Sequence, residues 1–578
     1  MAEARVIMMV GTGSHAGKSV LAAAVCRIFA RRGLRVAPFK AQNMALNSYV
    51  TPDGGELGRA QAYQATAAGV EPHVDMNPVL LKPSSMTGSQ VIVLGKPVGH
   101  MSVHEYHAYQ PTVWPVVTAA LARLRAVNDL VVIEGAGSPA EINLRERDIV
   151  NMKVALHAKA PTLLIGDIDR GGVFASLVGH WEIFTPEERE LVRGYIINKF
   201  RGDASLLDSG LEYLKQRTGV PTIGVIPMLT DWRGDEEDSL GIDDRRRKRR
   251  PDAPIQIAVI RLPFISNFTD FDTLADEDDV SVRFVTSVAE LGTPQVIVLP
   301  GTKSTIADLA WLRASGLAAA IGERVAAGTQ LVGICGGYQM LGQRILDPGH
   351  VESAEDEVAG LGLLDTVTTF AGEKRTVRVQ GELLGAEHGG SADFAAAAVS
   401  ARGEGAHSGS PAAASALGVA GTALSGYEIH MGRTVVGQGS APLLRLRAAD
   451  PPTAAATATA PALSDSDAAD SAVWHTDGAV SADGRICGSY VHGLFDHPQL
   501  RTAFLNGLRA AAGLPEREAT LADPADDIDR LADHVAAHLD MALLEEIVGL
   551  SAASAPSAAP ISPTSAAGAA GASEGSGS

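Results

Sequence analysis

The chain has 578 residues, of which 46% are hydrophobic and 20% charged, and its formal net charge is −19. One hydrophobic core does not organise this length, so we expect at least two domains. The acidic balance argues against a general nucleic-acid binder, and no run of about 18 apolar residues predicts a membrane span. A signal peptide is not apparent, and three distant cysteines (Cys26, Cys335 and Cys487) form no disulfide framework, so a cytoplasmic location is expected.

Short apolar strands alternate with helical patterns over the first part of the chain, which we define as a domain at residues 1–228. Alternation of this kind indicates an α/β fold with a largely parallel, doubly wound sheet. Residues 19–32 have the length and apolar spacing of a helix, and Gly33 follows as its C-cap. The expected strands are Val6–Val10, Arg35–Phe39, Leu130–Ile133, Thr162–Gly166, Gly194–Ile197 and Thr222–Ile226.

A glycine-rich loop joins the first expected strand to the first helix. It has the strand–loop–helix context of a P-loop, whose backbone N–H groups hold phosphate oxygens. Lys18 is expected to reach the β- and γ-phosphates and the Ser19 hydroxyl to bind Mg²⁺. The match is imperfect, because the usual leading glycine is replaced by Thr12 and Gly11 stands one position earlier. The predicted nucleotide-binding residues are Gly11, Thr12, Gly13, Gly17, Lys18, Ser19 and Asn198.

Two strand ends extend this nucleotide hypothesis. Glu134 follows Leu130–Ile133 and stands where a second metal-holding acid is expected beside Ser19; an ordinary strand-end carboxylate is the alternative. Asn198 follows Gly194–Ile197, where related folds read the base. Arg201 replaces the acid of a guanine-reading NKxD motif, so adenine is favoured. ATP and Mg²⁺ are therefore the expected cofactors.

A charged linker is expected at residues 229–254. Its basic run, Arg245 to Arg250, lies between acidic residues and a proline, so we interpret it as solvated charge. Strand and helix patterns then resume and predict a second α/β domain at residues 255–512. Its expected strands are Ile255–Ile260, Val280–Val285, Val296–Pro300 and Gln330–Ile334, followed by strand-like segments at Gly426–Val436 and Arg485–His492.

The second half also contains segments of low complexity. Ala/Gly/Ser-rich insertions at about 385–422 and 450–472 lack the apolar surface needed to order themselves. Helical patterns occur at about 498–512 and 527–549, and we assign residues 513–550 to a C-terminal helical segment. Residues 551–578 are expected to be a disordered tail.

Cys335 ends an apolar run and is followed by Gly336, Gly337 and a helical pattern. This arrangement predicts a nucleophile elbow, in which a sharp turn between strand and helix exposes one reactive side chain. The helix N-terminus favours thiolate over thiol, and backbone N–H groups of the turn can hold an oxyanion. An inert buried cysteine is the alternative, which the adjacent glycines disfavour.

Together these residues resemble the cobyric acid synthase family, the glutamine-dependent amidotransferases of cobalamin biosynthesis. The resemblance covers about residues 5–370 and 425–500, and the insertions and tail lie outside it. Its most specific runs are 37–44, 135–144, 167–174, 265–272, 299–305 and 427–432.

The resemblance implies an N-terminal domain similar to dethiobiotin synthetase and a C-terminal class I type glutamine amidotransferase domain. The implied reaction is ATP-dependent amidation of the b, d, e and g carboxylates of adenosylcobyrinic acid a,c-diamide, which gives adenosylcobyric acid. The implied partners are the corrinoid and L-glutamine, with neither nucleic acid nor membrane, and a homo-oligomer is left open.

The resemblance also implies site residues. Cys335 is the expected nucleophile and His492 its base, with His430 and His497 as weaker candidates. Many amidotransferases carry a glutamate two residues after the base, but this chain has Leu494, which cannot hold the imidazole tautomer. Either another group does so or a Cys–His dyad suffices; the resemblance favours the dyad, and no third residue is assigned. The expected oxyanion donors are the backbone N–H groups of Gly336 and Gly301. Expected substrate contacts are Lys40, Gln42, Asn43 and Lys82.

Two alternatives remain at this point. One is the sister synthase that amidates the a and c carboxylates, which the runs at 39–44 and 266–271 disfavour. The other is a P-loop partition or scaffold ATPase. Such ATPases carry a lysine where this chain has Gly13, and a scaffold leaves the elbow cysteine without a task.

Overall fold

Six parallel strands form the central sheet of the first domain, in the order β12-β11-β10-β1-β9-β2. The computed structural model describes residues 3–84, 87–229, 250–384, 416–449, 473–519 and 524–550. All six strands predicted from the sequence are confirmed, with ends shifted by up to three residues. They are β1 (Arg5–Gly11), β2 (Val36–Phe39), β9 (Leu130–Glu134), β10 (Thr162–Asp167), β11 (Val192–Phe200) and β12 (Thr222–Pro227).

Alternate residues of β1 point into two separate cores, because the side chains of a strand alternate between the faces of its sheet. Val6, Met8 and Val10 belong to one core and Ile7 and Met9 to the other. Helices cover both faces, which explains why the strands are apolar almost throughout. These helices are α1 (Lys18–Arg31), α2 (Arg59–Ala68), α3 (Val103–Val127), α4 (Met152–Ala158), α5 (Val173–Ile183), α6 (Pro186–Arg189) and α7 (Asp208–Thr218).

An additional β-layer, which the sequence did not predict, is inserted between β2 and α3. It consists of a four-stranded sheet, β3-β6-β7-β8, and a separate two-stranded hairpin, β4-β5. Its strands are short, and the hairpin faces the second domain. They are β3 (Gln42–Met44), β4 (Ser48–Val50), β5 (Glu56–Gly58), β6 (Val79–Pro83), β7 (Gly88–Val93) and β8 (Lys96–Ser102).

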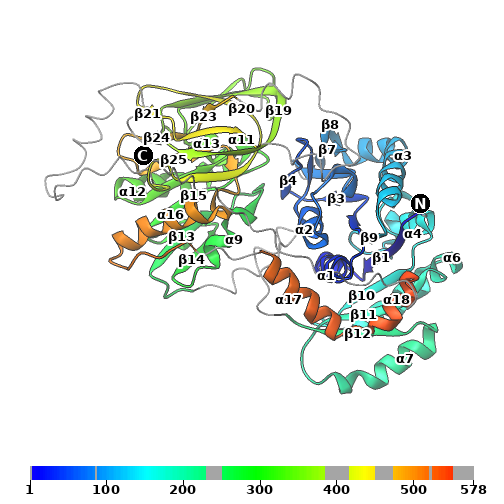
Figure 1. The fold of residues 1–578 in the computed structure, drawn as a ribbon. Coiled ribbons are helices and arrows are strands. Elements are labelled where there is room, and N and C mark those ends of the chain that lie inside the picture. Colours follow the sequence, from blue (N-terminus) through cyan, green and yellow to red (C-terminus); the bar gives the residue numbers. More distant parts are fainter. Residues whose placement is uncertain are drawn as a thin grey trace, which may run out of the picture.

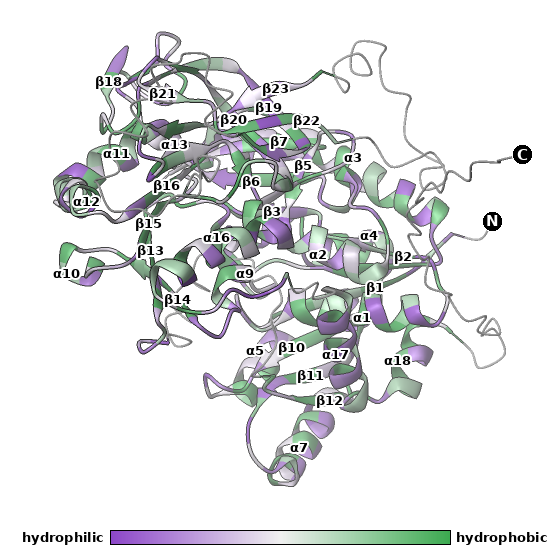
Figure 2. Ribbon diagram, turned by 60° about the vertical axis from the view of Figure 1, so that its left-hand side comes forward, coloured by the Kyte–Doolittle hydropathy of each residue, from purple (hydrophilic) through white to green (hydrophobic). Residues whose placement is uncertain are grey.

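The second domain is built on a sheet in the order β14-β13-β15-β16-β25-β24-β21, parallel from β14 to β25. The four strands predicted for its first part are confirmed, as are the later segments that form β20 and β25–β26. Figure 2 shows the inner strands largely green and the helices around them in both colours. The main strands are β13 (Ile255–Ile260), β14 (Val280–Val285), β15 (Val296–Leu299), β16 (Gln330–Ile334), β21 (Ser440–Ala441), β24 (Ala479–Ser481) and β25 (Ile486–Ser489).

A second, mostly antiparallel sheet lies beside this one. Its long strands β19 and β20 pair with each other, and β20 also pairs with β26. The remaining elements of this domain include the helices α9 (Asp272–Ala275), α10 (Val288–Leu291), α11 (Thr305–Ala314), α12 (Leu317–Ala326), α13 (Gly336–Leu341) and α16 (Pro498–Ala511), and the strands β17 (Arg344–Leu346), β18 (Glu357–Ala359), β19 (Thr366–Leu383), β20 (Ala423–Val436), β22 (Leu444–Ala448), β23 (His475–Asp477) and β26 (Val491–His492).

The C-terminal helical segment returns to the first domain. Figure 1 shows α17 (Pro524–Ala537) and α18 (Met541–Val548), in orange and red, beside β10–β12 of the first domain. Ile528 and Leu531 are buried in the same core as Ile7, and Arg27 of α1 pairs with Asp529 at 2.8 Å. The first domain is therefore completed by residues more than 500 positions away from its first strand.

The expectation that residues 385–422 fail to order themselves is wrong for their last part. Leu417 is fully buried, and the Ala416 N–H donates to the Gly484 carbonyl at 2.7 Å. The apolar contact of Leu417 with the core offsets the cost of ordering this stretch. The rest of this insertion (385–415), the second insertion (450–472), most of the linker (230–249) and the tail (551–578) lie outside the described residues. No helix in the described part of the chain is long and apolar enough to cross a membrane.

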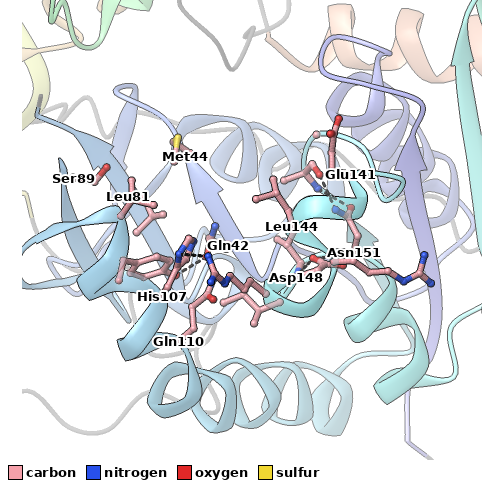
Figure 3. Close-up of a pocket in the computed structure, with 18 of the residues that line it drawn as sticks. Gln42, Met44, Leu81, Ser89, His107, Gln110, Glu141, Leu144, Asp148 and Asn151 are labelled. Atoms are coloured by element: carbon pink, nitrogen blue, oxygen red, sulfur yellow. Dashed lines mark hydrogen bonds between the residues drawn. The ribbon is translucent and has the colours of Figure 1, made fainter. Parts of the chain in front are cut away.

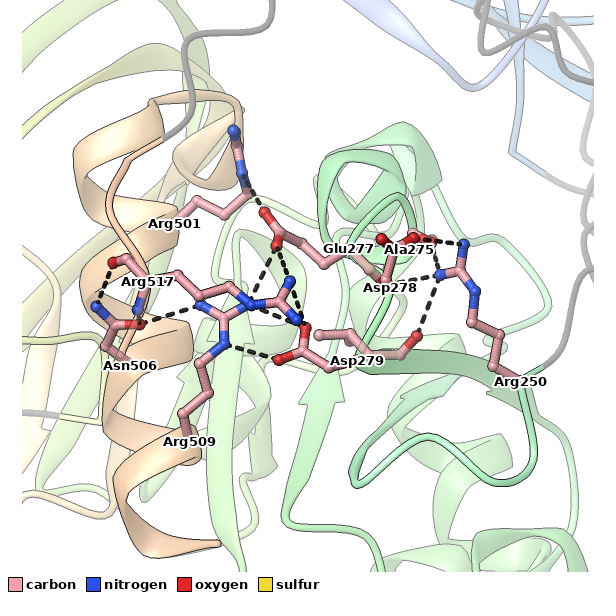
Figure 4. Close-up of polar contacts among 10 residues, drawn as sticks. Arg250, Ala275, Glu277, Asp278, Asp279, Arg501, Asn506, Arg509 and Arg517 are labelled. Atoms are coloured by element: carbon pink, nitrogen blue, oxygen red, sulfur yellow. Dashed lines mark hydrogen bonds and ion pairs between the residues drawn. The ribbon is translucent and has the colours of Figure 1, made fainter. Parts of the chain in front are cut away.

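A buried arginine attaches α16 to the edge of the second domain (Figure 4). Arg509 is 1% exposed; it donates to both carboxylate oxygens of Asp279, at 2.8 and 3.0 Å, and to Glu277 at 3.1 Å. Hydrogen bonding from Arg509 lowers the pKa of the Asp279 carboxyl. The guanidinium is thus satisfied in a place where an unpaired charge is costly.

Replacement of Arg509 by methionine is expected to destabilise the second domain by about 3 kcal/mol at pH 7, because it leaves two carboxylates without their main partner. A depressed pKa contributes stability above the unfolded-state value, and this contribution is lost as the pH falls through the folded value. The destabilisation should therefore shrink below about pH 4. Urea unfolding of the wild type and the variant, at pH 7 and below about pH 4, measures this loss of stability. An equal difference in unfolding free energy at the two pH values would contradict the role of the Asp279 pKa.

Candidate functional site

The predicted elbow has the expected geometry. β16 ends at Ile334, Cys335 adopts φ 52° and ψ −111°, and α13 starts at Gly336. The turn needs glycine at position 337, because a Cβ there would lie 2.0 Å from the Leu299 carbonyl oxygen. The Cys335 N–H donates to the Ser489 carbonyl of the neighbouring β25 at 2.8 Å. The side chain is thereby held in a strained backbone conformation at the carboxyl end of the sheet.

His492 lies next to this cysteine and is oriented by a buried carboxylate. Its Nδ1 is 2.7 Å from Asp270 Oδ2, both side chains are 1% exposed, and the imidazole lines the same cavity as Cys335, whose thiol donates to the Ile429 carbonyl at 3.6 Å. Burial by itself lowers the pKa of His492, but Asp270 and Cys335 outweigh it and raise this pKa to about 10. These neighbours therefore favour the charged form of the imidazole.

The expectation of a dyad without a third residue is corrected by Asp270. This aspartate lies in a 3₁₀ turn, Phe268–Phe271, and its second oxygen accepts the Gly493 N–H at 3.1 Å. Leu494 is buried and makes no such contact. The run at 265–272 had been recognised for its resemblance, but Asp270 and His492 are 222 positions apart, so local spacing could not connect them.

The two predicted oxyanion residues lie on either side of the elbow. Gly336 is the first residue of α13, so its N–H has no acceptor within the helix. Gly301 follows β15, and a Cβ on it would lie 2.7 Å from Cε1 of His492. Both backbone segments are close to the reactive groups; their role as donors to an oxyanion stays a prediction.

Of the two weaker histidine candidates, His430 lines the same cavity as Cys335. His430 stacks on Tyr490 with ring centroids 3.7 Å apart, and its Nδ1 is 2.8 Å from the Gly432 carbonyl oxygen. His497 stands at the start of α16. His430 also has a carboxylate neighbour, Glu428, whose Oε1 is 3.9 Å from the His430 Nε2; this contact is longer than the 2.7 Å between His492 and Asp270.

The cavity in front of Cys335 lies at the boundary of the two domains. Residues of the second domain form most of its wall, but Lys82 of β6 reaches it from the first domain. The Lys82 ammonium donates to Ser48 Oγ and Glu56 Oε1, both at 2.7 Å. Lys82, a predicted substrate contact, therefore lies at the cysteine cavity and not beside the P-loop.

The P-loop residues form a tight turn between β1 and α1. Gly17 has φ 94°, and a Cβ on it would lie 2.1 Å from Nδ2 of Asn198, so glycine is required. Lys18 Nζ donates to the carbonyls of Gly13 and Gly137, at 2.8 and 3.0 Å. Asn198 Nδ2 donates to the Ala16 carbonyl at 3.0 Å. Asn198 thus supports the loop backbone, a contact that the base-reading hypothesis did not anticipate.

Glu134 and Ser19 are brought together as predicted. The fully buried Glu134 accepts from Ser19 Oγ at 2.7 Å, from Lys40 Nζ at 3.0 Å and from Gln64 Nε2 at 2.6 Å. No group of three His, Cys, Asp or Glu side chains forms a metal site among the described residues. A hydroxyl beside one carboxylate still fits Mg²⁺, which usually keeps several waters and binds substrate phosphates. Lys40, predicted as a substrate contact, pairs here with Glu134.

A cavity of about 440 Å³ opens beside this nucleotide site. Figure 3 shows it between the inserted β-layer, α3 and the 3₁₀ segment Ile142–Arg147. Gln42 lines it and accepts from the Tyr106 hydroxyl. Asn43 instead is buried and donates to Gln61 Oε1 at 3.0 Å. Of the four predicted substrate residues, Gln42 is the one that lines this cavity.

Comparison with known proteins matches each half of the chain to a protein family. Residues 7–240 match the CobQ/CobB/MinD/ParA nucleotide binding domain, and residues 256–500 match the CobB/CobQ-like glutamine amidotransferase domain. The cobyric acid synthase of Sorangium cellulosum is 51% identical over 94% of this chain and 98% of its own length. The cobyric acid synthase of Dehalococcoides mccartyi (strain CBDB1) is 48% identical over 94% of this chain and 99% of its own length. That of Pelotomaculum thermopropionicum is 46% identical over 95% of this chain and 97% of its own length. The chain therefore belongs to the cobyric acid synthase family.

Proposed function

We propose that this protein uses glutamine and ATP to amidate the b, d, e and g carboxylates of adenosylcobyrinic acid a,c-diamide. Membership of the family supports glutamine-dependent amidation in cobalamin biosynthesis. The observation that carries the proposal is the pairing of a Cys335–His492–Asp270 triad with a P-loop in one chain.

In the glutaminase site, the Cys335 thiolate attacks the carboxamide carbon of glutamine. The His492 imidazolium donates its proton to the departing nitrogen, so ammonia leaves and a thioester remains. Water then hydrolyses the thioester to glutamate, with His492 accepting its proton. Asp270 holds the imidazole in one tautomer and stabilises its charge. The N–H groups of Gly336 and Gly301 are assigned to the oxyanion.

In the synthetase site, a corrinoid carboxylate oxygen attacks the γ-phosphorus of ATP and ADP leaves. The resulting acyl phosphate has a good leaving group, so ammonia displaces phosphate and forms the amide. Lys18 and the loop N–H groups are assigned to the transferring phosphoryl group, and Ser19 and Glu134 to Mg²⁺, which supplies charge neutralisation when bound.

The cavity beside the P-loop suits the corrinoid. Several apolar side chains at its wall are exposed to water, including Met44 (54%), Val103 (51%) and Leu144 (49%). Exposed apolar groups gathered at a cavity mark a binding surface, and a corrin ring offers a broad apolar face. Arg145 and Arg147 line the same cavity and can pair with peripheral carboxylates.

Replacement of Leu144 by glutamate is expected to raise the KM for the corrinoid by about 10-fold or more, because it places a charge against an apolar ring and near its carboxylates. The KM for ATP should change little. Leu206→Glu is the matched control, since Leu206 is 78% exposed and lies outside the cavity. Equal KM values for the corrinoid in both variants contradict this assignment.

Replacement of Asp270 by asparagine is expected to lower glutamine-dependent kcat by about 100-fold, because the imidazole loses its orienting anion. The pKa of His492 should fall, since Asp270 raises it. Protonated His492 donates to the leaving nitrogen, so activity should disappear at a lower pH than in the wild type. A pH profile of glutamine hydrolysis measures this. Asp483→Asn, in a surface turn, is the control, and an unchanged alkaline limb contradicts the role.

The sister synthase is separated from this proposal by its substrate. A direct assay offers the enzyme the a,c-diacid and the a,c-diamide with ATP and glutamine. Amidation of the diamide at further carboxylates supports the proposal, whereas conversion of the diacid alone overturns it.

A further inference from the structure

The cavity in front of Cys335 has an unusual balance of charge. Among the described residues that line it, three are lysines (Lys82, Lys303 and Lys374) and one, Glu352, is an acid. The proposed chemistry at Cys335 and His492 uses none of these four side chains. Glutamine, however, carries both a carboxylate and an ammonium group at its α-carbon, and the site has to bind them.

Two of the lysines already share one protein carboxylate. Glu56 of β5 is 1% exposed; it accepts from Lys82 at 2.7 Å and also from Lys374 of β19, across the domain boundary. The two ammonium groups hold the pKa of Glu56 well below its usual range, although burial opposes them. One anion between two cations leaves an excess positive charge at this wall of the cavity, which favours an anionic ligand.

Lys303 differs from these two lysines. Its side-chain nitrogen has no hydrogen bond or ion pair within the described part of the chain, although the backbone on both sides is fixed: the Lys303 N–H donates to the Phe264 carbonyl at 3.0 Å, and Ser304 Oγ donates to the Ser84 carbonyl at 3.3 Å. Burial lowers the pKa of Lys303, while the charges of Glu352 and Cys335 act on it in the opposite direction. The ammonium therefore lies within electrostatic reach of the reactive thiol.

Glu352 provides the opposite charge in the same cavity. One of its oxygens, Oε2, accepts the N–H groups of Thr305 and Ile306 at 2.8 and 3.4 Å, which fixes the carboxylate at the start of α11. Burial raises the pKa of Glu352 to about 7, and Lys303 lowers it. A cation that binds here stabilises the ionised form.

We propose that Lys303 binds the α-carboxylate of glutamine and that Glu352 binds its α-ammonium group, with the carboxamide directed to Cys335. This inference rests on the proposed glutaminase activity. It also gives the run at 299–305 two tasks, since Gly301 approaches the catalytic imidazole and Lys303 selects the substrate. Lys82 and Lys374, held by Glu56, favour the same carboxylate at longer range, and Lys82 brings a side chain of the synthetase domain to the glutamine cavity.

The test compares glutamine with two analogues that each lack one α-substituent. The first, 4-aminobutanamide, lacks the carboxylate, and the second, 5-amino-5-oxopentanoate, lacks the ammonium group. Ammonia release is measured for the wild type, Lys303→Met and Glu352→Gln. Lys215→Met, on an exposed face of α7, is the control for Lys303→Met. Each analogue should be a poorer substrate of the wild type by about 100-fold in kcat/KM, because a buried charge loses its partner.

Each variant is expected to tolerate the loss of one α-substituent of glutamine, and the two variants should differ in which one. Lys303→Met should lose about 100-fold in kcat/KM for glutamine, mainly through KM, and should no longer distinguish glutamine from 4-aminobutanamide. It should still reject 5-amino-5-oxopentanoate. Glu352→Gln should no longer distinguish glutamine from 5-amino-5-oxopentanoate, and it should still reject 4-aminobutanamide. A purely structural role for either residue would impair all three substrates alike.

Several results overturn the inference without affecting the proposed function. One is a wild-type enzyme that hydrolyses glutamine and both analogues equally well, which requires no variant. Another is a Lys303→Met enzyme that rejects 4-aminobutanamide as strongly as the wild type. Lys303→Gln replaces the methionine variant if that protein does not fold. A wild type that releases no ammonia from glutamine contradicts the proposed function itself.

Discussion

Replacement of Cys335 by alanine is expected to abolish glutamine-dependent amidation, by at least about 1,000-fold in kcat, because the variant lacks the nucleophile of the first half-reaction. Amidation with added ammonium salt should continue, since free ammonia in equilibrium with ammonium reaches the acyl phosphate without the thiol. The measurement is corrinoid amide formation with each nitrogen source in turn.

The other two cysteines provide a matched control for this variant. Cys487 is fully buried in β25, and burial raises the pKa of its thiol to about 12; burial raises the pKa of Cys26 as well. Neither thiol ionises at neutral pH, so an alkylating reagent should label Cys335 selectively. Cys487→Ala should keep glutamine-dependent activity. Full glutamine-dependent turnover in Cys335→Ala would show that the nucleophile is a different group.

The parallel strands and the P-loop could be predicted from the sequence because their signals are local. A buried parallel strand reads as a continuous apolar run, and a phosphate loop needs glycines at fixed spacing between a strand and a helix. The elbow at Cys335 is of the same kind. In each case neighbouring residues carry the whole pattern, so the fold class and the elbow geometry follow without tertiary information.

The remaining features depend on contacts between distant residues. Asp270 contacts His492 only when the turn at 268–271 packs near β26, and an isolated aspartate in a sequence carries no sign of this. The expected substrate contact Lys82 meets Lys374 of the other domain through Glu56, which no local pattern indicates. Similarly, the apolar faces of α17 and α18 predict helices but do not indicate which domain these helices pack against. Their partner, α1, is identified by the packing.

Further contacts between distant residues join the two domains near both sites. Ser48 of β4 donates its N–H to Asn267 Oδ1 at 2.9 Å, and the Phe268 N–H donates to Asn47 Oδ1 at 3.2 Å. These bonds attach the synthetase domain to the turn that carries Asp270. Close docking at this point is consistent with ammonia passing between the sites as a neutral molecule, because ammonium has no lone pair for attack on the acyl phosphate.

Replacement of Lys18 by methionine is expected to impair the synthetase reaction and to leave glutamine hydrolysis intact, the reverse of the Cys335→Ala variant. Amide formation should fall by about 100-fold or more with both glutamine and ammonia, because the phosphoryl transfer that activates the carboxylate loses its lysine. The buried stem of Lys18 is retained by methionine, so folding should be preserved. Glutamine hydrolysis without corrinoid should persist, since the triad lies in the other domain.

The Lys18→Met experiment therefore distinguishes an activating lysine from a structural one. Lys18 bridges the carbonyls of Gly13 and Gly137, and loss of these bonds alone could loosen the loop. A loosened loop would raise the KM for ATP and be overcome by high ATP, whereas loss of charge stabilisation lowers kcat at saturation. Lys215→Met controls for the loss of a lysine elsewhere in the domain. Unchanged kcat at saturating ATP would show that Lys18 holds the loop and does not act on the transferring phosphoryl group.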